Sequence, residues 1–248
     1  MTISSFLKRK SDYIKFRIKN PKVKIINPLK IGTYYSQEGQ DLYLSTLLFD
    51  EFKDKTEKNM VDIGCNDPEK FSNSLFFELF FKCNIIAIDP IKEYEILWNK
   101  TRPSATFIAS AIGKSNGTVA LMVPEKTSEF DDMFSSVTTK NSKIGDTKCT
   151  QRDVQLVTLD TIFTERKIKE VVLLSIDVEG AEVDVLQGID FNKTYIKCIL
   201  IENNSTSAYG SEEIRSILKD RGYIFLARIG FIDDVFLHNT LIDKLNRK

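Results

Sequence analysis

The sequence predicts an α/β fold in which one mainly parallel sheet is covered by helices. Short apolar stretches of strand length alternate with helix-like stretches over most of the chain, and this alternation is typical of parallel strands joined by right-handed crossovers. The last two strand-like stretches are joined by a short Gly-containing turn, which is typical of an antiparallel hairpin. Ligands of such sheets bind beyond the carboxyl ends of the strands, so residues at strand ends are the first candidates for a site.

The composition is that of one large domain. The chain has 248 residues, of which 42% are hydrophobic, and its net charge is zero, so we expect a full core and no nucleic-acid partner. No run of 18 apolar residues occurs, so we expect no membrane span. The four cysteines form no C-x-x-C pair, which favours a reducing cytoplasm over a disulfide scaffold.

Residues 1–35 are predicted to be a basic extension of a domain that spans residues 36–248. They hold nine Lys and Arg residues and one acid, Asp12. Their apolar residues are spaced as in a short amphipathic helix that Pro21 would end, and no secretion signal is recognised. Two interpretations stay open, a solvated helix packed on the domain or a weak contact surface for a membrane or a charged glycan.

The first half of the domain is predicted to begin with a helix over residues 36–52, capped by Ser36 or Asp41, because its leucines and Phe52 recur at helical spacing. Apolar, β-branched runs bounded by turn residues predict the strands, and Pro90 ends the second of them. The predicted strands are 60–64, 85–89, 105–112 and 118–123, and the predicted helices are 73–82 and 91–99.

The second half opens on residues 124–153, whose length and polarity predict a mobile segment over a binding site. Residues 171–177 form the most apolar strand and are predicted to lie at the sheet centre, buried on both faces. Gly188 is predicted to end the helix over residues 181–186. The remaining predicted strands are 154–159, 196–202, 223–228 and 235–238, and the helices are 181–186 and 211–220.

Residues 61–78 predict a nucleotide-sized binding edge, because a buried strand passes through a tight turn into the start of a helix. A glycine lets the backbone approach a ligand closely, and a helix start offers unpaired N–H groups. Asp89 ends the next strand, where an acid in such sheets holds the ribose hydroxyls of an adenosine cofactor. The candidate binding residues are Asp62, Gly64, Asn66, Ser72, Asn73 and Asp89. Both G-x-G-x-x-G and a P-loop are absent from this stretch, and a plain structural turn is the alternative.

Seven segments, in order along the chain, resemble the FkbM family of S-adenosylmethionine-dependent methyltransferases. They are SQEGQD at 36–41, VDIGCND at 61–67, FSNSLFFE at 71–78, AIDP at 87–90, VTLDTIF at 157–163, LLSIDVEGAEVDVLQGIDF at 173–191 and ILIEN at 199–203. The resemblance implies the Rossmann-like class I methyltransferase fold, with seven strands of which the last is antiparallel. It also implies methyl transfer from S-adenosylmethionine to a hydroxyl, commonly of a sugar or a polyketide, and places the adenine at Ser110 and Ala111.

The leading hypothesis is therefore an O-methyltransferase acting on a glycan, a glycan precursor or a similar small molecule. The chain departs from the family pattern at Pro68, where the family carries Gly. Proline has no N–H, so the loop loses one donor near the cofactor. A second hypothesis is a catalytically weak or inactive module that keeps the cofactor fold as a scaffold. A third is a sugar-modifying enzyme that uses a nicotinamide or a sugar nucleotide, against which the missing G-x-G-x-x-G argues.

A sugar hydroxyl is a poor nucleophile and needs a base or a metal. Asp177 is the first candidate base because it ends the central strand, and an acid that binds the cofactor amine or caps a loop is the alternative for it. Glu179 is the second candidate, and capping of the following helix is its alternative. Glu182 is predicted to cap the following helix. His238, the single histidine, is predicted to be structural.

A metal site is predicted at the neighbouring strand ends that carry Asp177, Glu202 and Asn203. Adjacent strands lie about 4.8 Å apart, so these oxygen donors can converge, and hard oxygen ligands suit Mg²⁺. The arrangement resembles the metal site of catechol-type O-methyltransferases. The alternative is that the two acids bind separate partners and that Asn203 caps a loop.

Overall fold

The computed structural model describes residues 34–53, 58–124, 136–137, 149–203, 210–230 and 232–245. The chain from Tyr34 onward is one compact unit. The predicted amphipathic helix of the basic extension lies outside the described residues. None of the helices in the described part has the length and apolarity needed to cross a membrane.

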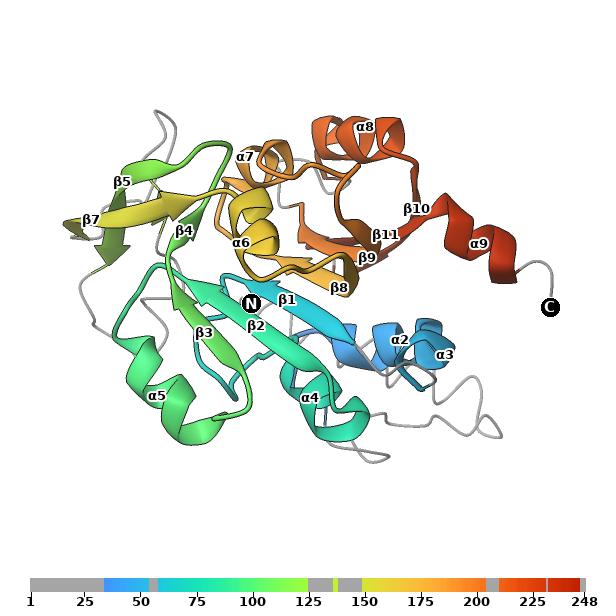
Figure 1. The fold of residues 1–248 in the computed structure, drawn as a ribbon, viewed down its shortest axis with the longest axis horizontal. Coiled ribbons are helices and arrows are strands. Elements are labelled where there is room, and N and C mark those ends of the chain that lie inside the picture. The colour runs from blue at the N-terminus through green and yellow to red at the C-terminus, as the bar shows by residue number, and fades with distance from the viewer. Residues whose placement is uncertain are drawn as a thin grey trace, which may run out of the picture. The chain divides into compact units, whose positions relative to one another are not determined.

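A seven-stranded sheet with the order β10-β11-β9-β8-β1-β2-β3 forms the centre of the unit (Figure 1). Its strands are β1 (Asn59–Ile63), β2 (Asn84–Asp89), β3 (Thr106–Ala109), β8 (Glu170–Ile176), β9 (Tyr195–Glu202), β10 (Tyr223–Ile229) and β11 (Asp233–His238). The first five of these pair in parallel, whereas β11 lies antiparallel between β9 and β10. The predicted mainly parallel sheet with an antiparallel last strand is confirmed, and the topology is Rossmann-like.

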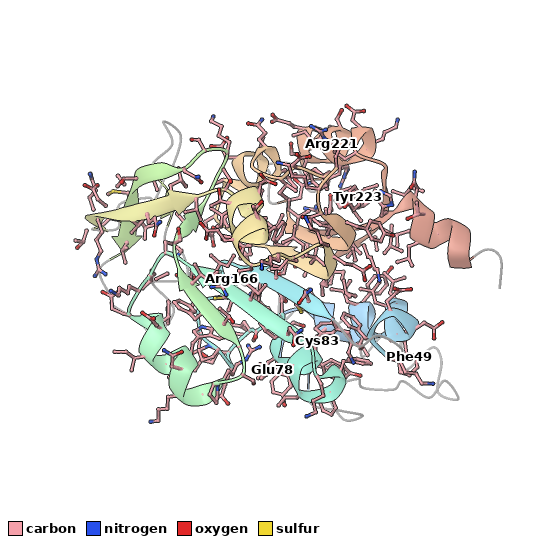
Figure 2. The ribbon with its side chains drawn as sticks, in the orientation of Figure 1. Phe49, Glu78, Cys83, Arg166, Arg221 and Tyr223 are labelled. Carbon is pink, nitrogen blue, oxygen red and sulfur yellow. The ribbon has the colours of Figure 1, made fainter. Side chains whose placement is uncertain are left out.

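Helices cover both faces of this sheet. The elements are α2 (Gln40–Leu47), α3 (Phe49–Lys53), α4 (Leu75–Phe81), α5 (Tyr94–Thr101), α6 (Leu159–Glu165), α7 (Glu182–Gln187), α8 (Glu212–Asp220) and α9 (Asn239–Leu245). Apolar residues of α6, α7 and α8 pack on one face, and those of α2 to α5 and α9 pack on the other (Figures 1 and 2). Successive strand residues point to opposite faces, so in β8 Leu173 joins one core and Leu174 the other. β8 is therefore buried on both faces, as predicted.

The helix predicted over 36–52 is divided, and its predicted caps are wrong. α2 begins after Gly39, whose φ is 83°, and the helix is interrupted at Leu48 before α3 begins. Ser36 and Asp41 bind each other instead, since the Ser36 hydroxyl donates to the Asp41 carboxylate at 2.6 Å. The Asp41 carboxylate also accepts the backbone N–H of Tyr35 at 2.7 Å, so this pair fixes the chain that leads into α2.

A second, smaller sheet corrects two further predictions. It contains β4 (Ala111–Ile112), β5 (Gly117–Pro124), β6 (Ser136–Val137) and β7 (Cys149–Val157). The strand predicted over 105–112 ends at Ala109, because the chain leaves β2 at Ser110 and then pairs with β7. Residues 149–153 of the predicted mobile segment are strand, paired with β5 from Ala120 to Pro124. β6 and Pro124 at the end of β5 are strand too, and residues 125–135 and 138–148 of that segment lie outside the described residues.

Candidate active site

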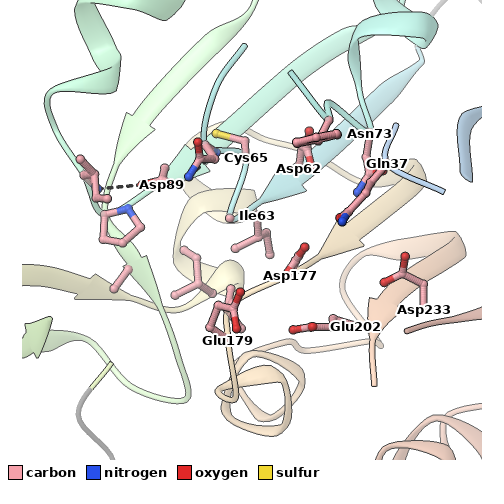
Figure 3. A pocket seen from close by; sticks show the side chains of 18 of the residues that line it. Gln37, Asp62, Ile63, Cys65, Asn73, Asp89, Asp177, Glu179, Glu202 and Asp233 are labelled. Atoms are coloured by element: carbon pink, nitrogen blue, oxygen red, sulfur yellow. Dashed lines mark hydrogen bonds between the residues drawn. The ribbon is translucent and has the colours of Figure 1, made fainter. Parts of the chain in front are cut away.

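The carboxyl ends of β1, β2, β8 and β9 and the start of β11 surround a cavity of about 260 Å³ (Figure 3). Ten of the predicted site residues line it: Asp62, Gly64, Asn66, Asn73, Asp89, Ser110, Ala111, Asp177, Glu179 and Glu202. Two predicted site residues, Ser72 and Asn203, do not. We call the part formed by Asp62, Gly64, Asn66, Asn73 and Asp89 the cofactor end. We call the part formed by Asp177, Glu179, Glu202 and Asp233 the acid end.

Gly64 brings the backbones of the two central strands together. Its φ of 74° is favourable for glycine alone, and a Cβ at this position would overlap with the backbone carbonyl of Asp177. Its N–H donates to the carbonyl of Ile88 at 2.9 Å, so the turn is also fixed to β2. The cofactor turn and the candidate base therefore lie directly against each other.

Asp89 holds two loops in place with its two carboxylate oxygens. One oxygen accepts the N–H of Ile91 at 2.8 Å, and the other accepts the N–H of Asn66 at 3.1 Å. Asn66 itself has a φ of 44°, which asparagine tolerates better than most residues. Asp89 is only 5% exposed, and it lines the cavity.

Two buried acceptors at the cofactor end have no hydrogen-bond partner within the described part of the chain. They are Oδ2 of Asp62, whose side chain is 3% exposed, and Oδ1 of Asn73. Burial raises the pKa of Asp62, while the Ser74 hydroxyl and the Arg102 charge act against this rise. A buried acceptor without a donor costs about 1–3 kcal/mol. These atoms therefore fit a ligand that brings donors, such as the ammonium group of S-adenosylmethionine.

Part of the cavity lining is apolar and suits a flat base. It includes Ile91, Ala111, Ile112 and Leu121. Ser110 also lines the cavity, but its hydroxyl is 3.0 Å from the backbone carbonyl of Gln155 and joins the two sheets. Ser72 is buried outside the cavity, where its hydroxyl accepts from Arg102 at 3.1 Å and supports the loop.

At the acid end, oxygen atoms of Asp177, Glu179 and Glu202 all lie within 4.8 Å of one another (Figure 3). Asp177 is accessible from the cavity, but the protein encloses it on the other sides. The enclosure desolvates the Asp177 carboxylate, and this is the largest cause that raises the pKa of Asp177 well above its usual value. The charges of Glu202 and Asp233 are the next causes. Desolvation and the neighbouring acids also raise the pKa of Glu179 to about 7 and that of Glu202 to about 8. These groups can hold and release a proton near neutral pH.

Asn203 is not directed at the predicted metal position. Its amide nitrogen donates to Asp234 at 2.8 Å and to the carbonyl of Ser211 at 3.1 Å. Its amide oxygen accepts the N–H of Ser211 at 2.6 Å. The side chain thus joins the end of β9 to the start of α8, and it is Glu179 whose oxygen lies within 4.8 Å of those of the two predicted acids.

Three other predicted roles can be placed. Glu182 accepts the N–H of Gly180 at 2.9 Å and so holds the loop before α7. His238 is outside the cavity lining and contacts the Thr240 hydroxyl at 2.8 Å and the ring of Tyr195. Pro68 is buried and outside the cavity lining, so its missing N–H removes no donor from the lining.

The cavity is also lined by Gln37, Gln40 and Asp233, which the sequence pattern did not indicate as site residues. The Gln40 amide donates to the Asp233 carboxylate at 2.6 Å and joins α2 to β11 across the acid end. Both glutamines belong to the SQEGQD segment, which had been matched to the family without a role. The signal for Asp233 was its place at the start of an antiparallel strand, which brings it to the same rim as Glu202.

A family model described as the methyltransferase FkbM domain matches residues 62–225, which is more than half of the chain. No curated protein matches the chain. A crystal structure of a SAM dependent methyltransferase from Aquifex aeolicus is similar over 86% of this chain and 97% of that chain, at 13% identity and a TM-score of 0.39. On the family match, the chain belongs to the FkbM methyltransferase family.

Proposed function

We propose that the protein is an S-adenosylmethionine-dependent O-methyltransferase that methylates a hydroxyl of a sugar, a glycan or a glycan precursor. The observation that carries the proposal is the place of Asp177, whose backbone abuts the Gly64 turn while its carboxyl group faces the acid end. A hydroxyl bound at the acid end would lie next to both a proton acceptor and the cofactor turn.

The residues of the cofactor end fit S-adenosylmethionine. Asp62 and Asn73 would accept the ammonium group, Asp89 would accept the ribose hydroxyls, and the wall around Ala111 would pack on the adenine. The cofactor, when bound, supplies an electrophilic methyl group. The protein supplies alignment and exclusion of water, which are the main requirements of an in-line displacement.

The acid end fits an acceptor that carries several hydroxyl groups. Its carboxylates and the amides of Gln37 and Gln40 offer many hydrogen-bond acceptors, and Lys70 is the one cation among the described lining residues. Carboxylates and amide oxygens accept from sugar hydroxyls, whereas a carboxylate or phosphate on the acceptor would be repelled. We propose Asp177 as the group that takes the hydroxyl proton, with Glu179 as an alternative base.

Mg²⁺ is the second part of the proposal. Three carboxylates with oxygens within 4.8 Å of one another offer the hard ligands that Mg²⁺ prefers, and a bound cation lowers the pKa of a hydroxyl. The ligands we propose are Asp177, Glu202 and, in place of Asn203, Glu179. Methylation that continues unchanged in excess EDTA, and does not rise on adding Mg²⁺, would remove the metal from the proposal and leave Asp177 as a base.

Calorimetric titration tests the cofactor. We expect S-adenosylmethionine to bind with a micromolar Kd and NAD not to bind, and mass spectrometry should then detect methylated products in a panel of neutral glycans. Binding of NAD alone would favour the nicotinamide hypothesis, and binding of neither ligand would favour the scaffold. We also propose a cytoplasmic location, supported by the four free cysteines, and a contact of the basic extension with an anionic surface.

A further inference from the structure

We propose that Trp98 and Arg102, at the end of α5, are positioning residues that hold the cofactor loop, residues 64–74, in its binding conformation. Both are buried, with side chains 1% and 3% exposed, and neither lines the cavity. The inference rests on the proposed S-adenosylmethionine binding, because that loop carries Gly64, Asn66 and Asn73.

Arg102 holds the second half of the loop through one guanidinium nitrogen. Nη1 donates to the carbonyl of Pro68 at 3.0 Å and lies 3.1 Å from the hydroxyls of both Ser72 and Ser74. Nε forms an ion pair with Glu78 of α4, which orients the guanidinium plane. The contact at position 68 uses the backbone carbonyl, so it does not depend on the N–H that proline lacks.

Trp98 holds the first half of the loop. Its indole N–H donates to the carbonyl of Asn66 at 2.7 Å. Its ring stacks under the Arg102 guanidinium, 4.4 Å from the ring centroid, so the two side chains support each other. The end of α5 therefore holds the loop on both sides of Pro68.

The contacts of Trp98 and those of Arg102 are each linked to an acid of the cofactor end. Asn66, which accepts from Trp98, donates its own N–H to Asp89. The Ser74 hydroxyl, which contacts Arg102, and the Arg102 charge both act against the rise that burial causes in the pKa of Asp62. Loss of the contacts of either side chain should displace a group that the cofactor needs, although neither Trp98 nor Arg102 lines the cavity where the cofactor would bind.

Trp98→Phe is the sharpest test, because it keeps an aromatic ring under Arg102 and removes the indole N–H. We expect the Kd for S-adenosylmethionine to rise about five- to tenfold, as for the loss of one hydrogen bond, while kcat at saturating cofactor stays close to the wild-type value. Phe107→Leu is the matched control. The Phe107 ring of β3 packs against the Trp98 ring at 5.9 Å between centroids, and its side chain has no polar atom that could hydrogen-bond the loop, so this variant should lower stability and leave Kd unchanged.

Hydrogen exchange of the ligand-free protein gives a readout that does not depend on the cofactor. We expect the amides of residues 64–74 to exchange faster in Trp98→Phe and in Arg102→Lys than in the wild type or in Phe107→Leu. Unchanged exchange in both variants, or an equal rise in Kd for Trp98→Phe and Phe107→Leu, overturns the inference. Wild-type protein that fails to bind S-adenosylmethionine would overturn the proposed function instead, and the exchange data would still decide whether α5 holds the loop.

Discussion

The two ends of the cavity handle polar groups in opposite ways. At the cofactor end, Asp89 is fixed by two backbone N–H groups, and the loop around Asn66 is held by α5. At the acid end, carboxyl groups lie close together, and desolvation, with their mutual repulsion as the second cause, raises the pKa values of Asp177, Glu179 and Glu202. The loops of the cofactor end are thus fixed without a ligand, and within the described chain only Asp62 and Asn73 there lack donors, whereas the acid end needs a proton, a hydroxyl or a cation to complete it.

This difference separates the effects expected from substitutions. Changes at the acid end should alter catalysis and leave cofactor binding intact, because that end supplies the proton acceptor. Changes at the cofactor end should alter the affinity for S-adenosylmethionine and the order of the loops. A variant that crosses this division would show that the two ends act as one unit.

Asp177→Asn should have the largest effect. The amide cannot accept a proton, so we expect kcat to fall about 10³-fold, within the range usual for loss of a general base, while the Kd for S-adenosylmethionine stays near the wild-type value. Asp184→Asn, the same change on the outer part of α7, is the control and should be neutral. Activity of Asp177→Asn within a few-fold of the wild type would remove Asp177 from the reaction.

Asp89→Ala should have the next largest effect, on cofactor affinity. The change removes a charged acceptor for the ribose hydroxyls, which we expect to cost about 2–3 kcal/mol of binding free energy. It also frees the N–H groups of Asn66 and Ile91, so the melting temperature must be measured beside the calorimetric Kd. A folded variant with unchanged affinity would contradict the placement of the ribose.

The sequence could predict the features that depend on local pattern. Apolar runs such as residues 171–177 and the turn at Gly64 depend on local pattern, and the structure confirms the sheet they predict. The change of sheet at Ser110 depends on β7, which is far away in the sequence, and no local signal marks it. The strand over residues 149–153 was hidden in the same way, because its polar residues pair with β5 rather than forming a core.

The acid end was harder to predict because its members come from separate elements. Asp177 and Glu202 were found as acids at strand ends, whereas Asp233 begins a strand and reaches the same rim only because β11 runs antiparallel to β9. The Gln40 contact with Asp233 joins positions 193 residues apart. Asn203 follows Glu202 in the sequence, but the sequence did not show that α8 would begin close enough for Ser211 to hydrogen-bond the Asn203 amide.

Asn203→Ala should have the smallest effect on the reaction and tests where the acid end stops. The Asn203 amide holds Ser211 and Asp234, so its loss should lower the free energy of unfolding by about 1–3 kcal/mol, measured in urea. The response of kcat to Mg²⁺ and to EDTA should match that of the wild type, because the amide is already occupied outside the cavity. Asn203→Asp separates the two roles further, since a carboxylate would bind a cation at least as well as the amide but would repel Asp234. A metal ligand would therefore tolerate Asp and lose metal affinity with Ala, whereas the structural role predicts lower stability in both variants and an unchanged metal response in both.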